Sequence, residues 1–164
     1  MLIAYIGLGS NLSGFLKSPQ RQLEEAIKHI SGHPGIVVKN VSSFYETKPI
    51  GPQNQPDFVN AVANIETSLA PLMLLDYLQK IEANHDRERI QKWGARTLDL
   101  DILLFDNQQI NSKRLTIPHP EIENRAFVLA PLLEIYPNFK PLSGKTARTL
   151  LEKCKEQGIV KLKS

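Results

Sequence analysis

The chain of 164 residues contains only one cysteine, Cys154, and this scarcity excludes several kinds of structure. A single thiol cannot form an intramolecular disulfide, and it cannot build a metal site from several cysteines. Such cysteine usage is typical of proteins in a reducing cytosol. We therefore expect a cytoplasmic protein in which Cys154 packs within a late helix.

Long apolar runs and clusters of one charge are also missing. No stretch of about 20 apolar residues is present that could span a membrane. The first seven residues lack the basic region of a signal peptide, so we expect neither export nor membrane insertion. The formal net charge is only +3, without a run of Lys and Arg. This mild surplus favours anionic ligands in general, a nucleotide as well as a nucleic acid.

Two phosphate-binding motifs are absent as well. Residues 7–11 read Gly-Leu-Gly-Ser-Asn, but the second half of G-x-G-x-x-G is missing, and so is G-K-[ST]. We therefore interpret residues 7–11 as a turn that follows a strand at residues 2–8. With 41% hydrophobic and 23% charged residues, the chain can bury a core, and we expect one globular, monomeric domain over residues 1–164.

The hydrophobic periodicity of residues 2–105 predicts the order strand, helix, strand, strand, helix, strand. This βαββαβ order is typical of a ferredoxin-like α+β sandwich, with an antiparallel sheet whose helices cover one face. Additional helices are expected in the C-terminal third. The predicted strands are 2–8, 36–45, 58–66 and 97–105. The predicted helices are 19–31, 68–84, a helix from 123 or 124 to about 134, and 146–156, and the charged segment 85–92 is predicted to be a loop.

Two carboxylates lie within the last of these strands. From Thr97 onward, polar and apolar residues alternate, so that Asp99 and Asp101 share one face of the strand. Their Cα atoms should be roughly 7 Å apart, close enough for one divalent cation or a pair of cations. A solvated acidic face is the alternative. Trp93 and Arg96 lie just upstream and favour a cation-binding site over a solvated face.

Two other polar residues, Asn60 and His119, are candidates for ligand binding because of where they lie in the chain. On the strand at 58–66, Asn60 shares a face with Phe58. Its amide could therefore bind the edge of a flat heterocycle on which the Phe58 ring stacks. The alternative is an exposed strand asparagine without such a role. His119 lies between two prolines, where hydrogen bonding to a ligand or to the protein is favoured over metal binding.

The segment Trp93-Gly94-Ala95-Arg96-Thr97-Leu98-Asp99-Leu100-Asp101-Ile102 resembles the signature of the 6-hydroxymethyl-7,8-dihydropterin pyrophosphokinase family. The similarity extends over almost the whole chain, including Gly9-Ser10-Asn11, Ser42-Ser43-Phe44-Tyr45 and Gly51-Pro52-Gln53. It implies that the β,γ-diphosphate of ATP is transferred to the hydroxymethyl group of the pterin, with release of AMP, in folate biosynthesis.

The resemblance also implies roles for individual residues. Asp99 and Asp101 would bind two Mg²⁺ ions, and Arg87 and Arg96 would stabilise the diphosphoryl group in transit; no general base is assigned. The positions that match the ATP site are Gln79, Glu82, Arg89, Ile102, Arg114, Thr116 and His119. Those that match the pterin site are Thr47, Ile50, Phe58, Asn60, Trp93, Arg125 and Phe127, with the ring between Phe58 and Phe127.

Two other functions fit parts of the pattern. An RNA-binding ferredoxin-like module would share the topology, but no strand carries the RNP1 pattern, and acidic side chains on the sheet would repel phosphate unless a metal is present. We therefore expect no nucleic-acid partner. A small-molecule kinase would share the metal site and differ in releasing ADP.

Overall fold

The computed structural model describes residues 1–10, 18–47, 58–92 and 98–162, with the side chains of 86–92 and 156 outside the description. Six strands in this part of the chain form one sheet in the order β5-β1-β4-β3-β8, with β2 also paired to β4, and every pair is antiparallel. A separate hairpin joins β6 and β7. The strands are β1 Leu2–Ser10, β2 Ile36–Val41, β3 Tyr45–Thr47, β4 Phe58–Thr67, β5 Leu98–Phe105, β6 Ile110–Asn111, β7 Thr116–Ile117 and β8 Ile159–Lys161.

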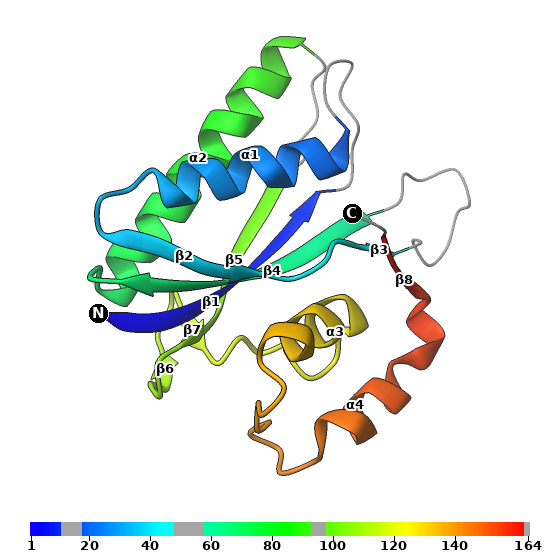
Figure 1. Ribbon diagram of the computed structural model, residues 1–164. Coiled ribbons are helices and arrows are strands. Elements are labelled where there is room, and N and C mark those ends of the chain that lie inside the picture. The colour runs from blue at the N-terminus through cyan, green and yellow to red at the C-terminus, as the bar shows by residue number, and fades with distance from the viewer. Residues whose placement is uncertain (11–17, 48–57, 93–97, 163–164) are drawn as a thin grey trace.

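Helices lie on both faces of the sheet (Figure 1). Helices α1 (Pro19–Ser31) and α2 (Pro71–Lys92) cover one face, while α3 (Ala126–Ile135) and α4 (Ala147–Lys153) lie on the other. Each face has its own hydrophobic cluster, around Ile6 and Leu78 on the first and around Leu103 and Leu129 on the second. The predicted antiparallel α+β architecture is confirmed. The second face is not left open, because α3 and α4 pack over part of it.

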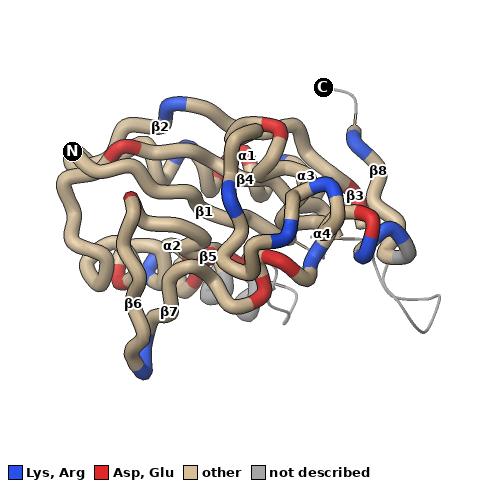
Figure 2. The backbone as a smooth tube through the Cα atoms, turned by 90° about the horizontal axis from the view of Figure 1, so that it is seen from below, with Lys and Arg blue, Asp and Glu red and all other residues tan. Residues whose placement is uncertain are grey.

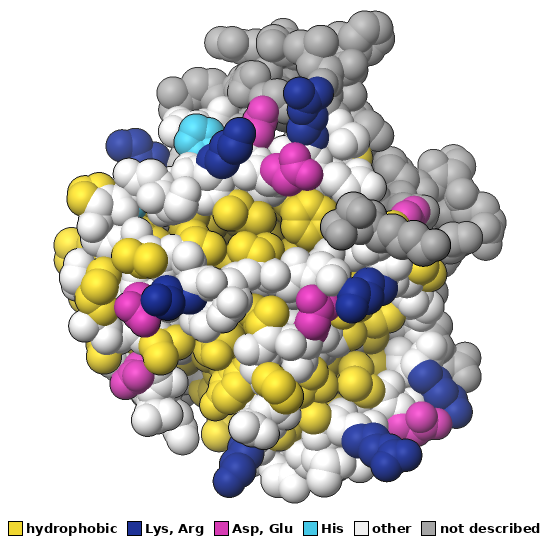
Figure 3. Space-filling model, in the orientation of Figure 1, with side chains coloured by type: hydrophobic (Ala, Val, Ile, Leu, Met, Phe, Trp, Pro, Cys, Tyr) yellow, Lys and Arg dark blue, Asp and Glu magenta, His cyan; other side chains and the backbone are white. Residues whose placement is uncertain are grey.

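The outer surface mixes apolar and charged side chains. In the space-filling view, hydrophobic side chains show below α1 and α2, with Lys, Arg, Asp and Glu distributed around them (Figure 3). No helix among the described residues has both the length and the apolar character needed to cross a bilayer.

The first helix follows its sequence signals. The Ser18 hydroxyl accepts a hydrogen bond from the backbone N–H of Arg21, Pro19 occupies the first turn, and Gly32 ends the helix. The buried face includes Leu23, Ala26 and Ile30, three or four residues apart as a 3.6-residue period requires.

The second helix differs from its prediction at both ends. It begins at Pro71 and continues to Lys92, so the segment 85–92 is helical and not a loop. That segment is rich in Arg, Glu, Gln and Lys, which are good helix formers, and it contains no glycine or proline; propensity outweighs the missing apolar period. Leu74, Leu75 and Leu78 form the buried face of the helix, and Leu72 is 45% exposed.

Two predicted strand boundaries are also wrong. The strand expected over 36–45 is interrupted after Val41, where the Ser42 hydroxyl accepts from the Val62 N–H and donates to the Ser43 carbonyl. The turn expected at residues 7–11 is strand as far as Ser10, and Asn11 lies outside the described residues. The polar Ser42 thus interrupts a strand that its apolar neighbours predict, whereas Gly7 and Gly9, a residue type that usually marks turns, take part in strand pairing.

The C-terminal third also departs from its predicted boundaries. Helix α3 begins at Ala126, and α4 ends at Lys153, where Cys154 is buried as the helix C-cap. A 3₁₀ helix, η1 (Lys155–Gln157), follows, and Gly158 at φ 60° turns the chain into β8. Strand β8 pairs with β3 and was not predicted, because three residues are too few to show a period of two.

One polar cluster joins α3 to the sheet edge. The carboxylate of Glu134 accepts a hydrogen bond from the Tyr45 hydroxyl at 2.6 Å, and from the N–H and hydroxyl of Ser43 at 2.8 and 3.0 Å. Lys161 on β8 lies 3.8 Å away. Burial alone would raise the pKa of Glu134, but the bonds from Tyr45 and Ser43, together with Lys161, lower it. Burial, followed by the bond to Glu134, raises the pKa of Tyr45.

This cluster predicts an acid-sensitive stability. Because the pKa of Glu134 is lower in the folded protein than its ordinary 4.5, the carboxylate stabilises the fold fully above that pH and progressively less below it. Glu134→Gln should therefore lower the free energy of unfolding at neutral pH, and the difference from the parent protein should shrink below about pH 4. Urea unfolding across this pH range measures both effects. Glu152→Gln, which removes an exposed ion pair with Lys155, should show neither.

Candidate active site

Two glycines in a central strand form the floor of the site. Strand β1 lies between β5 and β4, and its register places Gly9 opposite both Asp99 and Asn60. Residues opposite one another on paired strands point to the same face, so Asp99 and Asn60 project from that face with no side chain between them. At about 4.8 Å per strand spacing, their Cα atoms are roughly 10 Å apart.

A second row repeats this arrangement. Gly7 lies between Asp101 on β5 and Val62 on β4. A Cβ atom built on Gly9 would lie 2.8 Å from the Asn60 Oδ1, and one built on Gly7 would lie 3.3 Å from the Leu103 side chain. The glycines thus leave a trough between a row of carboxylates and a row of polar and apolar side chains.

Helix α3 closes this trough into a cavity of about 490 Å³, which we call the glycine-floored cavity. Its volume is in the range of small-molecule sites. Besides Gly7 and Gly9, it is lined by eight of the residues proposed from the sequence: Thr47, Phe58, Asn60, Asp99, Asp101, His119, Arg125 and Phe127. Residues from β3, β4, β5 and α3, far apart in the sequence, therefore meet in one cavity.

The two carboxylates fit a hard divalent cation. Asp99 and Asp101 project from the same face of β5 into the glycine-floored cavity. Mg²⁺ prefers oxygen ligands and is commonly held by one or two carboxylates, with phosphates and water completing its coordination. No group of three or more acidic, His or Cys side chains suited to a metal occurs among the described residues.

The opposite side of the cavity is aromatic and polar. Phe58 and Phe127 come from β4 and α3, and the guanidinium carbon of Arg125 lies 5.6 Å from the centre of the Phe127 ring. Asn60 is 6% exposed, and its Nδ2 donates to the Thr47 hydroxyl at 3.4 Å. An amide held in this way beside two aromatic rings can bind the polar edge of a flat ligand.

His119 is oriented by backbone hydrogen bonds. The backbone N–H of His119 donates to the Leu103 carbonyl at 2.9 Å, and its ring Nδ1 accepts from the Glu121 backbone N–H at 3.1 Å. Because Nδ1 is an acceptor, a neutral ring carries its proton on Nε2 and offers that N–H as a donor.

A second group of predicted residues lies on the side of β5 that α2 covers. The β6–β7 hairpin projects there, seen from below in Figure 2, and Arg114 in its loop donates to Gln79 at 3.2 Å and pairs with Asp76. Glu82 accepts from the Leu100 N–H at 2.7 Å. Ile102 is buried among core residues on this side, so its side chain does not reach the glycine-floored cavity; Thr116 begins β7.

The side chains of five predicted site residues lie outside the part of the chain that the structure describes. The backbones of Arg87 and Arg89 belong to the last turns of α2, and their side chains lie outside the description. Ile50, Trp93 and Arg96 lie outside the described residues altogether.

Several cavity residues were missed by sequence reasoning. Gly7 and Gly9 were interpreted as turn residues, although a glycine inside an apolar strand pattern also indicates a close approach to a neighbour or ligand. Gln157 and Val128 line the cavity from the C-terminal third. No local pattern in the sequence distinguishes Gln157 from the other polar residues around it.

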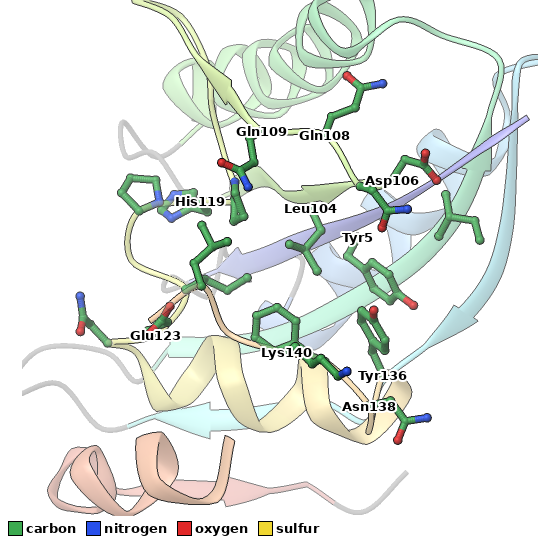
Figure 4. A pocket seen from close by; sticks show the side chains of 18 residues that line it. Tyr5, Leu104, Asp106, Gln108, Gln109, His119, Glu123, Tyr136, Asn138 and Lys140 are labelled. Carbon is green, nitrogen blue, oxygen red and sulfur yellow. The ribbon is translucent and has the colours of Figure 1, made fainter. Parts of the chain in front are cut away.

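A larger cavity of about 770 Å³ lies on the same side of the sheet, beyond His119, which lines both cavities. Tyr5 and Tyr136 stack at 5.0 Å between ring centres on one side of it, with Lys140 close by, while His119 lies across the opening (Figure 4). Burial, followed by the neighbouring Tyr136, raises the pKa of Tyr5. None of the metal-binding or pterin-site candidates that the structure describes lines this second cavity.

Comparison with known proteins identifies the family. Residues 5–137 match the family described as 7,8-dihydro-6-hydroxymethylpterin-pyrophosphokinase. The chain belongs to this family. It is 48% identical, over 99% of both chains, to the 2-amino-4-hydroxy-6-hydroxymethyldihydropteridine pyrophosphokinase of Haemophilus influenzae. It is 44% identical to the Pseudomonas aeruginosa protein of the same name, over 96% of this chain and 95% of that one. The resemblance found in the sequence is confirmed, and this pyrophosphokinase is an enzyme of folate biosynthesis.

Solved structures agree on the fold. A wild-type Plasmodium falciparum HPPK-DHPS with pterin and p-hydroxybenzoate has a TM-score of 0.68 at 17% identity, covering 95% of this chain and 44% of that one. An HPPK-DHPS in complex with substrates has the same TM-score and identity, with 94% and 44% covered. This chain thus spans less than half of those longer proteins.

The close approach at Gly9 predicts an overpacked variant. Gly9→Ala should force the Asn60 amide away and lower the free energy of unfolding by about 1–3 kcal/mol, the usual cost of an added methyl group in a packed site. Gly32→Ala is the matched control, since Gly32 has a helical φ of −76° and a Cβ there would make ordinary contacts at 3.4 Å. Chemical denaturation compares the two. A Gly9→Ala protein as stable as the parent would contradict the packing described.

Proposed function

We propose that the glycine-floored cavity is where this pyrophosphokinase transfers the β,γ-diphosphate of ATP to the hydroxymethyl group of 6-hydroxymethyl-7,8-dihydropterin. One observation carries the proposal: a paired-carboxylate strand and an aromatic, amide-bearing wall face each other across a floor without side chains. This arrangement suits two substrates of different chemistry, a polyphosphate beside the carboxylates and a flat heterocycle beside the rings. Family membership supports the same pair of substrates.

The pterin would lie between Phe58 and Phe127. Stacking on both rings would fix its plane, and Asn60, held by Thr47, would bind its polar edge. Arg125 would border the ring from the N-terminus of α3, and Ile50 and Trp93 are proposed to complete the site. In this pose, the hydroxymethyl group faces the side of the cavity that holds Asp99 and Asp101.

Asp99 and Asp101 would hold two Mg²⁺ ions. When bound, such ions neutralise charge on the polyphosphate and orient it for in-line displacement. The pterin hydroxyl oxygen attacks the β-phosphorus, the bond from that phosphorus to the α,β-bridging oxygen breaks, AMP leaves, and the hydroxyl proton passes to solvent. Arg87 and Arg96 are proposed to stabilise the diphosphoryl group during this transfer. Positioning and charge neutralisation suffice for the reaction, and no general base is assigned.

The rest of ATP would extend over the edge of β5. Gln79, Arg114 and Thr116 lie on that side, with Glu82 bonded to the strand and Ile102 beneath it. His119 would donate from Nε2 near the boundary between the two faces, and Arg89 would extend from α2. We assign this group to the nucleotide.

The remaining proposals concern the whole chain. We propose that residues 1–164 form one domain, a monomer whose sheet order β5-β1-β4-β2 with crossovers α1 and α2 is ferredoxin-like. The shared hydrophobic clusters, to which the C-terminal third contributes, support a single domain. A cytoplasmic location is supported by the single, buried cysteine.

The product of ATP turnover tests the proposed transfer. Protein mixed with Mg²⁺, ATP and the hydroxymethyl dihydropterin should release AMP in step with pterin diphosphate, as measured by chromatography of the nucleotides. Release of ADP would instead indicate a kinase that moves only the γ-phosphoryl group.

Removing one carboxylate tests the proposed metal site. Asp99→Asn and Asp101→Asn should each lower turnover at least about a hundredfold, because the loss of a metal ligand costs several kcal/mol of transition-state stabilisation. Asp106→Asn is the control, since Asp106 lies outside the glycine-floored cavity and its φ of 51° is one that asparagine tolerates. Circular dichroism should show that all three variants are folded. Turnover in the first two that matched the control would refute the metal role.

A further inference from the structure

Helix α3, which carries Phe127, begins without a cap of its own. Arg125 is at the N-cap position, but its side chain accepts no hydrogen bond from the helix, and the first turn contains no acidic residue. The first N–H groups of a helix have no partners within the helix, and a side-chain acceptor usually satisfies one of them. The start of α3 therefore depends on an acceptor from elsewhere in the chain.

Gln157 supplies this acceptor from the C-terminal segment. Its Oε1 accepts from the Ala126 N–H at 2.8 Å, and its Nε2 donates to the Asn124 carbonyl at 2.9 Å. These two backbone groups flank Arg125 on either side. One amide side chain thus holds the residues before and after Arg125, and with them the direction in which α3 starts.

Gln157 is itself held at both ends. Its N–H donates to the carbonyl of Cys154 at 2.9 Å, and Cys154 is buried in the hydrophobic cluster beneath α3. After Gln157, Gly158 turns the chain at φ 60° into β8, where Ile159 pairs with Thr47. Gln157 therefore lies between the start of α3 and the β3 end of the cavity, and its side chain lines the glycine-floored cavity.

We propose that Gln157 is a positioning residue for the pterin substrate, setting Arg125 and Phe127 at the distance from β4 that the ring requires. The inference rests on the proposed function of the glycine-floored cavity. It assigns a role in the reaction to a residue beyond the segment 5–137 that matches the family. Because Gln157 acts through α3 and lies away from the carboxylates, its loss should weaken pterin binding and leave ATP binding and the chemical step intact.

Two substitutions separate the hydrogen bonds of Gln157 from its bulk. Gln157→Met keeps a similar length and volume but makes neither bond, whereas Gln157→Glu keeps an acceptor for Ala126 and loses the donor to Asn124. Steady-state AMP release gives kcat and the KM of each substrate, and fluorescence titration gives the affinity for the pterin. Gln157→Met should raise the KM for the pterin about tenfold, with kcat and the KM for ATP within about twofold. Gln157→Glu should raise it about threefold.

Matched variants make each outcome decisive. Lys155→Met, in the same 3₁₀ helix but in an exposed ion pair with Glu152, should leave all three constants unchanged. Phe127→Ala should raise the KM for the pterin whatever Gln157 does, and an unchanged value there would overturn the proposed pterin site itself. If Phe127→Ala has this effect but Gln157→Met leaves the KM for the pterin within twofold, or worsens kcat and both KM values alike, the positioning role is refuted. If Gln157→Met fails to fold, the same criteria apply to Gln157→Glu.

Discussion

The site depends on two positions in the sheet that are occupied by glycine and therefore carry no side chain. Gly7 and Gly9 lie in β1, between the strand that carries the carboxylates and the strand that carries Asn60. Any other residue at position 9 would place a Cβ within 2.8 Å of the Asn60 amide and fill the space that separates it from Asp99. Glycine in a strand interior costs backbone entropy and packing area, and the long pairings of β1 with both neighbours offset that cost. The strand can therefore remain central and still leave room for a ligand.

The two sides of this cavity are held in different ways. The sheet side is backed by α1, α2 and a large hydrophobic cluster, so its position is set mainly by burial. On the other side, α3 is fixed at its beginning by Gln157 and near its end by Glu134, both through hydrogen bonds to distant segments. Hydrogen bonds are directional where hydrophobic contact is not, and they set the spacing of an aromatic wall more narrowly. The C-terminal segment thus determines the width of the cavity although it supplies few of its lining residues.

Sequence reasoning succeeded where a pattern was long. The alternation through Asp99 and Asp101 and along β4 correctly assigned each residue to a face, and residues from both strands meet in one cavity. It failed where one residue type has two uses: Gly9 pairs within a strand although glycine usually marks a turn, and residues 85–92 are helical although their charges suggested a loop. It could not foresee Gln157, because that role exists only once the C-terminal segment returns to β3. Local patterns determine elements and faces, whereas tertiary contacts determine which polar residues matter.

The edge position of β5 connects these observations. Asp99 and Asp101 face the cavity, while Ile102 faces the helices, and β1 pairs with only one side of the strand. Backbone groups elsewhere on β5 are used by side chains and loops: the Leu100 N–H donates to Glu82, and the Leu103 carbonyl accepts from His119. Such contacts protect an edge strand from pairing with another chain without adding a further strand beside it. A ligand can then extend from one face to the other around this edge, which is what a nucleotide must do if its phosphates lie at the carboxylates and its base lies beside α2. A carboxylate pair on a central strand would give access to one face alone.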